Sequence, residues 1–402
     1  MNNHVLHRAP LVVPMAGPPI IDGGVLWADG RIVAVGPFAG LRVEGGRVVE
    51  HEGCALVPGL VNAHAHLELS HLAPLGREAA FSSFPGMTEW ISVLLHRRET
   101  APASGEEIAA QARAASQDLR RTGTILVADT GNRPESAHLG QHDGMDALFF
   151  LEFLGLSRAA AEAGLKRLAA VEAGTACTAH APYSTAPDLI RGLKQRAAAA
   201  GRLFSIHVAE SADEIEFLRT GGGPLRRFLE SRGAWDGSFA PPGCGAVDDL
   251  HRLGVLDGRT LCVHAVHLSS GEIDTLASRQ AKVCLCPGSN RTLGVGKAPV
   301  AKLLAAGIRP ALGTDSLASN PRLDLWEEMR LLREDHPEVA PEEVFAMATA
   351  NGAAALGCAG RLGSLAPGRD ARLLAVRCPV PPDDIFEFLT TAGPEAEVRW
   401  VE

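Results

Sequence analysis

The sequence predicts an α/β protein: a (β/α)8 TIM-type barrel with a small β-sandwich domain formed from both chain termini. Over residues 56–364, apolar runs alternate with helical stretches rich in Ala and Leu, an order that indicates a parallel sheet with right-handed crossovers. Eight such units within about 300 residues fit a closed barrel better than an open sheet. Both ends of the chain have instead the pattern of short strands and turns.

The end segments predict the smaller domain. Residues 23–36, GGVLWADGRIVAVG, contain an Asp-Gly turn between alternating apolar residues, which is typical of an antiparallel hairpin. Residues 360–379 return to the same pattern near the C-terminus. We therefore expect one β-domain from residues 1–55 plus 365–402, and a barrel domain from residues 56–364.

Within the barrel domain, each expected strand is a short apolar run between turn signals. The eight expected strands are residues 55–63, 122–130, 146–154, 174–181, 202–209, 259–266, 281–287 and 307–315. The clearest helical stretches between them are residues 105–121, 157–172, 186–200 and 298–306.

Composition limits what the protein can be. Its 402 residues are 46% hydrophobic and 21% charged, enough apolar material for a sizeable core. The formal charge of −9 argues against nucleic acid as a partner, and the chain has no apolar run of the roughly 18 residues that a membrane span needs. We see no convincing secretory leader and expect a cytoplasmic protein. The eight cysteines form no CxxC pair, so we expect buried free thiols.

The first barrel strand ends in two histidines separated by one residue. Because side chains alternate faces along a strand, His64 and His66 are expected to point to the same side. Two imidazoles on one side form half of a metal site, although a histidine pair on a solvated strand end is the simpler alternative.

Four other expected strands also carry polar residues at their carboxyl ends, where barrel enzymes hold their chemistry. These residues are His180, His207 with Glu210 three positions later, His264 and Asp315. Each has a structural alternative: a lone histidine can be hydrogen-bonded, Asp315 can cap the next helix, and Glu210 can occupy a first helical turn. Agreement between strands favours a metal site, and three imidazoles with one carboxylate suit a single zinc.

Several motifs occur in an order that resembles one enzyme family. They are PGLVNAHAHLE (58–68), HVAE (207–210), VHAVHL (263–268), GTDSLASN (313–320) and GSLAPGRDA (363–371). Over essentially its whole length the sequence resembles the amidohydrolase superfamily, in the branch of cytosine, guanine and adenosyl-nucleoside deaminases and triazine hydrolases. The resemblance implies a hydrolase that acts on C–N bonds of cyclic amidines.

The resemblance also implies roles for the strand-end residues. The metal ligands that it implies are His64, His66, His207 and Asp315. The catalytic residues that it implies are Glu210, His264 and Asp315. Members with two metals bridge them with a lysine at the end of the fourth strand, and residues 174–181 contain none, so one divalent metal is expected. Zinc is the first expectation, with Fe²⁺ or Mn²⁺ as alternatives.

Deamination is the expected reaction, because a carboxylate that protonates a ring nitrogen suits aminopurines and aminopyrimidines. Glu89, within MTEW (87–90), resembles the glutamate that binds ribose hydroxyls in adenosyl-nucleoside deaminases, although a glutamate at a helix start is the alternative. His180 resembles the residue that donates to a purine ring nitrogen. Together these residues imply an aminopurine nucleoside as the small-molecule substrate.

One run narrows the substrate further. CPGSNRTLGVG (286–296), together with HAHLELS (64–70), resembles the aminodeoxyfutalosine deaminases of the alternative menaquinone pathway. Their substrate is an adenosine whose ribose carries a carboxyphenyl ketone extension. Arg291 or Arg133 could pair with that carboxylate, although either could be a surface arginine. Glu68 is expected either to hydrogen-bond in the pocket or to orient His66.

Alternatives remain open at this point. A deaminase of adenosine, methylthioadenosine, S-adenosylhomocysteine or guanine is the nearest, followed by a triazine-type chloro- or aminohydrolase. A non-enzymatic barrel is a third, but it predicts missing metal ligands, and every ligand position here is filled. Members of this branch often form homodimers, so a homodimer is an open expectation.

Overall fold

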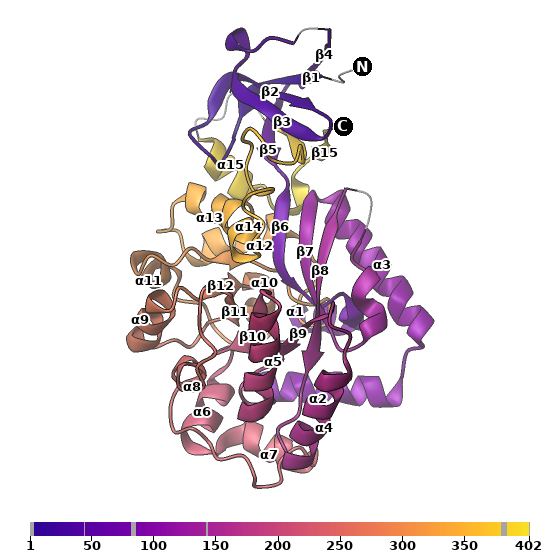
Figure 1. Ribbon diagram of the computed structural model, residues 1–402, viewed down its shortest axis with the longest axis vertical. Coiled ribbons are helices and arrows are strands. Elements are labelled where there is room, and N and C mark those ends of the chain that lie inside the picture. The colour runs from indigo at the N-terminus through magenta and orange to yellow at the C-terminus, as the bar shows by residue number, and fades with distance from the viewer. Residues whose placement is uncertain (1–3, 44, 82–85, 142–143, 379–383, 402) are drawn as a thin grey trace.

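The structure is a computed structural model that describes residues 4–43, 45–81, 86–141, 144–378 and 384–401. Its strands form three sheets: one mixed sheet from both chain ends, and two four-stranded parallel sheets between them. Figure 1 places the mixed sheet at one end of the molecule, close to both chain termini, with the parallel strands and their helices below it.

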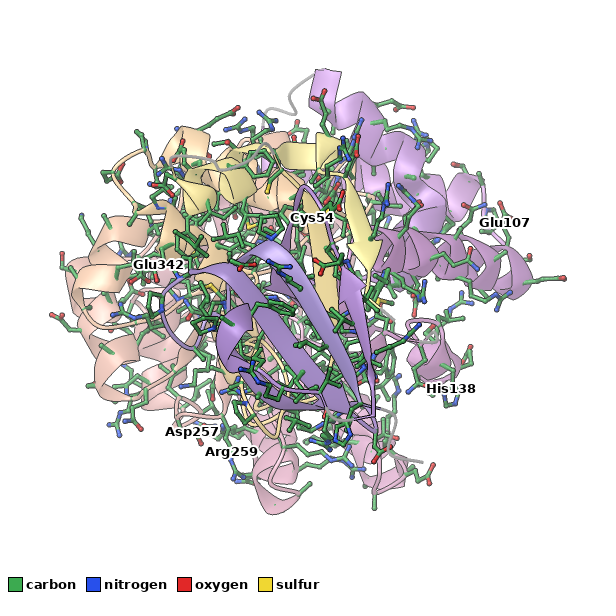
Figure 2. The ribbon with its side chains drawn as sticks, turned by 90° about the horizontal axis from the view of Figure 1, so that it is seen from above. Cys54, Glu107, His138, Asp257, Arg259 and Glu342 are labelled. Carbon is green, nitrogen blue, oxygen red and sulfur yellow. The ribbon has the colours of Figure 1, made fainter. Side chains whose placement is uncertain are left out.

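The mixed sheet has seven strands in the order β15-β14-β5-β1-β2-β3, with β4 paired to β1. Its strands are β1 (Val5–Val12), β2 (Ile20–Ala28), β3 (Arg31–Pro37), β4 (Arg47–Glu50), β5 (Cys54–Pro58), β14 (Leu373–Arg377) and β15 (Val398–Trp400). Because β14 pairs antiparallel with β5, hydrogen bonds tie the C-terminal segment to the N-terminal one. Figure 2 looks onto this sheet from above, with Cys54 labelled. The described residues place these strands in a single sheet, so the expected two-sheet sandwich stays a prediction.

The first expected barrel strand is divided in two. β5 ends at Pro58 in the mixed sheet, and β6 (Leu60–Ala65) begins two residues later in a parallel sheet. Gly59 lies between them, and a Cβ there would come within 2.1 Å of Cγ2 of Ile125. The side chain of Ile125 thus occupies the space that a larger residue at 59 would need, and the strand expected at 55–63 is wrong as a single element because it contributes to two sheets.

The parallel strands occur where the sequence predicts them. They form the sheets β6-β7-β8-β9 and β10-β11-β12-β13. After β6 their bounds are β7 (Thr124–Gly131), β8 (Asp146–Phe153), β9 (Ala176–Ala179), β10 (Phe204–Val208), β11 (Thr260–His264), β12 (Lys282–Leu285) and β13 (Ala311–Leu312). This parallel α/β arrangement is consistent with a TIM-type barrel.

Hydrogen bonds join the two parallel sheets at both of their free edges. The backbone N–H of His207, on β10, donates to the carbonyl oxygen of His180, just beyond β9, at 2.9 Å. At the other edge, Ala65 forms a parallel bridge with Asp315, and the N–H of Thr314 donates to the carbonyl oxygen of His64 at 3.0 Å. Residues expected in the site therefore lie where the two sheets meet.

Helices fill the connections. They are α1 (Ala73–Phe81), α2 (Met87–Thr100), α3 (Gly105–Arg121), α4 (Arg158–Ala170), α5 (Pro187–Ala199), α6 (Ala212–Thr220), α7 (Gly223–Ser231), α8 (Ala246–Arg252), α9 (Ser270–Ser278), α10 (Pro287–Thr292), α11 (Val300–Ala305), α12 (Leu325–Asp335), α13 (Pro341–Met347), α14 (Ala350–Ala355) and α15 (Ile385–Thr391). Short 3₁₀ turns occur at η1 (Phe38–Gly40), η2 (Leu67–Leu72), η3 (Pro134–His138) and η4 (Gly393–Glu395).

Local sequence explains the clearest helices. Ser104 caps α3 by accepting the N–H of Glu107 at 3.1 Å, and Arg120 and Arg121 occupy the last turn, where cations favour the helix dipole. α9 begins with a capping box between Ser269 and Glu272. No helix of the described residues is both long and apolar enough to cross a membrane.

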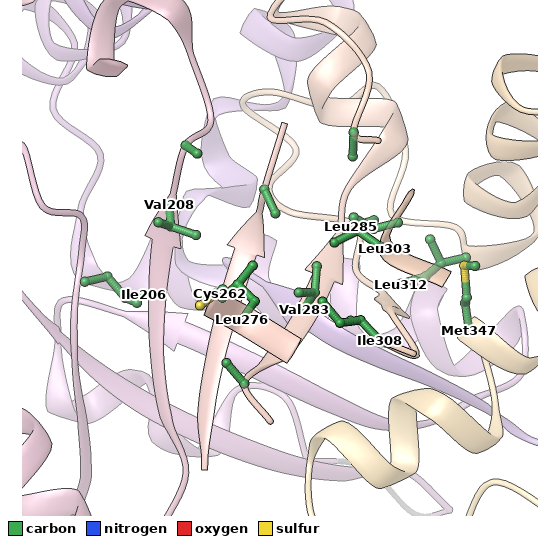
Figure 3. Close-up of a cluster of buried hydrophobic side chains, with 14 of the residues drawn as sticks. Ile206, Val208, Cys262, Leu276, Val283, Leu285, Leu303, Ile308, Leu312 and Met347 are labelled. Carbon is green, nitrogen blue, oxygen red and sulfur yellow. The ribbon is translucent and has the colours of Figure 1, made fainter. Parts of the chain in front are cut away.

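The core lies between the parallel strands and the helices outside them (Figure 3). Ile206 and Val208 of β10 are buried in it, and because side chains alternate along a strand, His207 between them points to the opposite side. Burial of two apolar residues thus orients the histidine. All eight cysteines are free; seven are buried and Cys358 is half-buried, as expected.

Candidate metal centre and active site

β6 presents His64 and His66 as the sequence predicts. Both side chains are buried, and their rings meet edge to face with centroids 4.7 Å apart. Asn62 fixes the backbone beside them, because its Oδ1 accepts the N–H groups of His64 at 3.3 Å and of Thr314 at 3.2 Å. The end of β6 is thereby tied to the segment that carries Asp315.

Three imidazole nitrogens converge with one carboxylate. Nε2 of His207 lies 3.1 Å from Nε2 of His64 and 3.2 Å from Nε2 of His66. Oδ1 of Asp315 lies 3.8 Å from Nε2 of His64 and 3.7 Å from Nε2 of His66. All four residues are buried, and they are the four ligands that the sequence predicts.

This donor set fits a divalent metal. Nδ1 of His207 donates to the carbonyl oxygen of His180 at 2.8 Å, which leaves Nε2 with a free lone pair. Oδ2 of Asp315 accepts the hydroxyls of Ser289 at 2.6 Å and Ser319 at 2.9 Å, which leaves Oδ1 free. Nitrogens bound to one tetrahedral zinc at about 2.1 Å would lie about 3.4 Å apart, close to the spacing seen here.

The charges of these groups suit the same purpose. Burial lowers the pKa of His64 and of His207 well below the usual value, so both imidazoles are neutral. Burial alone would raise the pKa of Asp315, but His264, His66 and His64 outweigh it and lower that pKa to about 2. Neutral imidazole and ionised carboxylate are the forms that bind metal.

Glu210 and His264 adjoin the four predicted ligands. Nε2 of His264 lies 3.5 Å from Oε1 of Glu210. Nδ1 of His264 donates to Oδ1 of Asn290 at 3.0 Å, so Nε2 is left as an acceptor. Burial, and then the charge of Asp315, raise the pKa of Glu210 well above its usual value. This shift favours the neutral carboxyl, the form that can act as a general acid.

The chain is strained at the strand ends that carry these residues. Positive φ angles occur at Ala209 (52°), His264 (71°), Ala265 (51°) and Asp315 (57°), none of which is glycine. Such conformations cost about 1–3 kcal/mol each and concentrate at functional sites. They turn the backbone sharply just where the side chains must face one another.

A cavity of about 490 Å³ opens beside this group. His66, His207, Glu210, His264 and Asp315 line one end of it. A volume of this size holds a small organic molecule, and Glu210 lines it together with three of the four predicted metal ligands.

Two of the expected substrate-binding residues reach the cavity. His180 is on its wall, and its Nδ1 lies 2.6 Å from the hydroxyl of Ser184, which fixes the ring and leaves Nε2 without a protein partner among the described residues. Glu68 also lines the cavity, but its Oε2 accepts the N–H groups of Asn132 at 3.1 Å and Arg133 at 3.2 Å. Glu68 thus holds the loop after β7 in place.

Three other expected residues lie elsewhere. Glu89 is exposed on α2 and is not part of the cavity wall. Arg291 lies outside the cavity, where it pairs with Glu334 and Asp335 at 2.8 Å each. Arg133 also lies outside the wall, with its Nε 3.9 Å from Oε1 of Glu68. The structure does not bring these three side chains to the metal site.

Sequence reasoning missed Glu152, which lines the cavity near the end of β8. Its Oε2 accepts Nδ2 of Asn132 at 3.0 Å, and its buried Oε1 lies 3.8 Å from Nδ1 of His207 and has no hydrogen-bond partner among the described residues. The sequence does contain a signal for Glu152. It is a charged residue within the apolar run of residues 146–154, near the carboxyl end of an expected barrel strand, where functional residues gather.

The comparisons with known proteins agree with this geometry. The model of the amidohydrolase family matches residues 55–398. A 5-methylthioadenosine/S-adenosylhomocysteine deaminase of Moorella thermoacetica is 30% identical over 420 aligned positions, which span 99% of this chain and 92% of that protein.

Two solved structures extend the likeness to the fold. An adenosine deaminase from Xanthomonas campestris with bound zinc has a TM-score of 0.77 at 27% identity, covering 97% of this chain and 89% of its own. An aminofutalosine deaminase from Helicobacter pylori has a TM-score of 0.82 at 24% identity, covering 99% and 97%. At this identity the second shows likeness of fold alone.

Proposed function

The chain belongs to the amidohydrolase family, and we propose that it is a metal-dependent deaminase that converts a 6-aminopurine nucleoside into the 6-oxo product and ammonia. Membership of this family makes it a hydrolase. The observation that carries the proposal is Glu210, a buried carboxyl beside His264 and Asp315 in the cavity wall, whose pKa burial raises well above its usual value. A purine ring nitrogen must gain a proton before the neighbouring carbon is attacked, and a neutral carboxyl supplies it.

The metal site is proposed to be His64, His66, His207 and Asp315. A divalent ion in such a set lowers the pKa of water towards neutrality, which makes hydroxide available at physiological pH. We propose zinc, since one imidazole-rich site with a carboxylate suits it and the Xanthomonas campestris adenosine deaminase contains it. Iron and manganese are the alternatives to be tested.

Three side chains then position the water and carry out the proton transfers. The carboxylate of Asp315, held in place by the hydroxyls of Ser289 and Ser319, accepts the proton of the attacking water. His264 holds that water through Nε2, because Asn290 occupies Nδ1. Glu210 protonates the ring nitrogen and regains a proton from the hydroxyl group at C6 as the 6-oxo group forms, while Asp315 passes the proton taken from water to the departing ammonia. Proton transfer of this kind contributes roughly 10²- to 10⁴-fold to the rate.

His180 and Glu152 are proposed to hold the substrate. The Nε2–H of His180 donates to a purine ring nitrogen, and Ser184 fixes the ring for it. Oε1 of Glu152 is buried, lines the cavity and lacks a partner among the described residues, so it accepts a hydrogen bond from the ligand. The ribose-binding role expected for Glu89 stays a prediction, because that side chain lies outside the cavity wall.

The best candidate substrate is 6-amino-6-deoxyfutalosine, which would place the enzyme in menaquinone biosynthesis. The sequence run CPGSNRTLGVG supports it. The Moorella thermoacetica relative supports the wider class of 5′-modified adenosines. Arg291 and Arg133 do not reach the cavity, so the residue that would bind a substrate carboxylate must be sought elsewhere.

For the architecture, we propose that the two parallel sheets close into one (β/α)8 barrel. The hydrogen bonds between His207 and His180 and between Thr314 and His64 support closure. We also propose a separate β-domain from residues 1–55 plus 365–402. Because β5 ends at Pro58, the first of these segments would extend to Pro58. Helix α15 (Ile385–Thr391) belongs to the second of these segments in sequence, and it contacts α12 and α13 of the barrel domain.

The experiment is an ammonia-release assay of purified, zinc-loaded protein. Aminodeoxyfutalosine, adenosine, methylthioadenosine, S-adenosylhomocysteine and guanine are compared side by side, with atrazine as the test of triazine chemistry. A preference for one 6-aminopurine nucleoside by more than tenfold in kcat/KM, about 1.4 kcal/mol, supports the proposal and names the substrate. Turnover of atrazine, with every purine untouched, would overturn it.

A further inference from the structure

Beyond the metal site the cavity continues into a second part, here called the distal compartment. Its wall is almost entirely apolar and comes from α2, the loop after β8 and the end of α7. The apolar residues that form it are Ile91, Leu94, Leu95, Leu154, Phe228 and Leu229. Leu154 is 48% exposed, although it is large and apolar, so a ligand there has apolar surface to cover.

One face of α2 runs along the whole cavity. Met87, Ile91, Leu94 and Arg98 all line it and recur every three or four positions, which places them on a single helix face. Met87 packs against Val266, two residues beyond His264, so this end of α2 lies next to the metal site. At 1.5 Å per residue, Arg98 lies about 16 Å further along the helix.

Both carboxylates and arginines line the cavity. Glu152, Glu210 and Asp315 lie beside or within the proposed metal site, and Glu68 lies in η2, where it holds the loop after β7. The two arginines of the wall are Arg98, in the last turn of α2, and Arg232, the residue that follows α7. The distal compartment therefore combines an apolar wall with two cations.

The two arginines differ in their partners. Arg232 is bonded to Glu99, which neutralises it. Arg97, the neighbour of Arg98 on α2, pairs with Glu78 at 2.5 Å. Arg98 has neither an ion pair nor a hydrogen bond within the described ranges, although it is half-buried in the cavity wall. A guanidinium held against an apolar wall without a counter-charge is suited to bind an anion, and it matches a carboxylate through two parallel hydrogen bonds.

We infer that Arg98 is the residue that selects the substrate, by binding a carboxylate at the end of an apolar 5′ substituent that fills the distal compartment. This inference rests on the proposed deamination of a nucleoside at the other end of the cavity. A cavity of about 490 Å³ is large enough for a nucleoside extended by a group the size of a substituted phenyl ring.

The same charges argue against an amino-acid tail. A zwitterionic tail brings an ammonium group together with its carboxylate, and an ammonium group needs a carboxylate partner when it leaves water. Glu99, the carboxylate closest in sequence to Arg98, is already bonded to Arg232 and is not part of the described wall. A tail with one negative charge and no positive one fits this compartment.

The test compares two nucleosides that differ in one group: 5′-deoxy-5′-[(4-carboxybenzyl)thio]adenosine and its neutral carboxamide. The zinc-loaded wild type should deaminate the acid with a kcat/KM at least tenfold above that of the amide. Arg98→Met should reduce this acid-to-amide ratio at least tenfold, whereas Arg97→Met, which removes a cation from the same helix outside the cavity, should keep it. Equal use of acid and amide by the wild type, or an undiminished ratio in Arg98→Met, would overturn the inference.

A binding measurement separates this inference from the proposed reaction. Calorimetry with 4-pentylbenzoate and the neutral 4-pentylbenzamide needs no turnover. If Arg98 binds carboxylates, the benzoate binds the wild type and the Arg97→Met variant more tightly than the amide does, and Arg98→Met weakens it at least tenfold. This result would support the anion site even if no nucleoside were deaminated. Equal affinity for the benzoate in all three proteins would refute the site, whatever the reaction.

Discussion

The carboxylate of Glu214 accepts the backbone N–H of Glu210 at 2.8 Å, and its other oxygen accepts the N–H of Ala209 at 3.0 Å. Ala209 has a φ of 52°, which an L-residue adopts only at a cost. Glu214 is fully buried in the first turn of α6, and the side chain of Ser211 accepts the backbone N–H of Glu214. Two hydrogen bonds from one side chain therefore hold the turn that aims Glu210 into the cavity.

Replacement of Glu214 by Gln should disturb this turn without touching the metal ligands. An amide can accept one of the two N–H groups, but its NH₂ must face the other. We expect kcat to fall about tenfold, consistent with the loss of one of the two hydrogen bonds, while zinc content stays the same. The pH profile of kcat should also show a shift in the apparent pKa of the group that donates the proton. Glu216→Gln, an exposed change on the same helix, is the control; unchanged kcat and an unchanged pH profile in Glu214→Gln would contradict the positioning role.

Glu210→Gln tests the proton donor itself. The amide keeps the size of the side chain and cannot protonate a ring nitrogen, so turnover should fall by roughly 10²- to 10⁴-fold. Metal analysis should find zinc at the wild-type level, because the proposed ligands are untouched. Near-normal turnover would mean that the ring proton comes from another group.

His207→Ala removes one of the four proposed ligands and the residue whose Nε2 faces both His64 and His66. We expect the purified variant to lose its zinc and its activity together, since three ligands bind far more weakly than four. Metal content by mass spectrometry and ammonia release are measured on the same sample. His138→Ala, on an exposed 3₁₀ turn, is the control; full activity with zinc intact in His207→Ala would refute the assignment.

His7 gives a prediction about stability and pH. It is buried in the mixed sheet, with Nδ1 2.9 Å from Nε2 of His51 and its ring packed on Trp27. Burial, with smaller contributions from His51 and Arg47, lowers the pKa of His7 to about 4. The unfolded chain binds the proton more readily, so the free energy of unfolding falls as pH drops from about 6.5 to about 4, by at most about 3 kcal/mol from this group.

Thermal melts at a series of pH values check this. His7→Phe keeps an aromatic ring against Trp27 and cannot titrate, so its melting temperature should fall less steeply below pH 6.5 than that of the wild type. The exposed change His138→Phe should follow the wild-type curve. Parallel curves for His7→Phe and wild type would show that His7 does not carry this dependence.

Much of the site could be predicted because its residues obey local rules. The spacing of two between His64 and His66 places both rings on one strand face, and strand ends gather at one side of parallel sheets. Those rules bring together His207, Glu210, His264 and Asp315 without knowledge of any long-range contact.

The remaining parts depend on contacts that no local pattern encodes. Gly59 divides one apolar run into two strands because Ile125, from a distant segment, packs against it. Arg291 was one of two candidates to bind a substrate carboxylate, with a surface arginine as the alternative, and the structure pairs it with Glu334 and Asp335 on α12. Arg98 reaches the cavity because α2 crosses it, a placement that is set by tertiary packing such as the contact of Met87 with Val266.

The most direct test of the central claim, one metal and one general acid acting on a 6-aminopurine nucleoside, is a zinc titration of metal-free protein with ammonia release as the readout. 5′-Methylthioadenosine and aminodeoxyfutalosine are the substrates, each at saturating concentration. We predict that activity on at least one of them rises in proportion to added zinc and levels off at one equivalent per chain. Activity that needs two equivalents, or no ammonia from either nucleoside with one equivalent bound, would contradict the account.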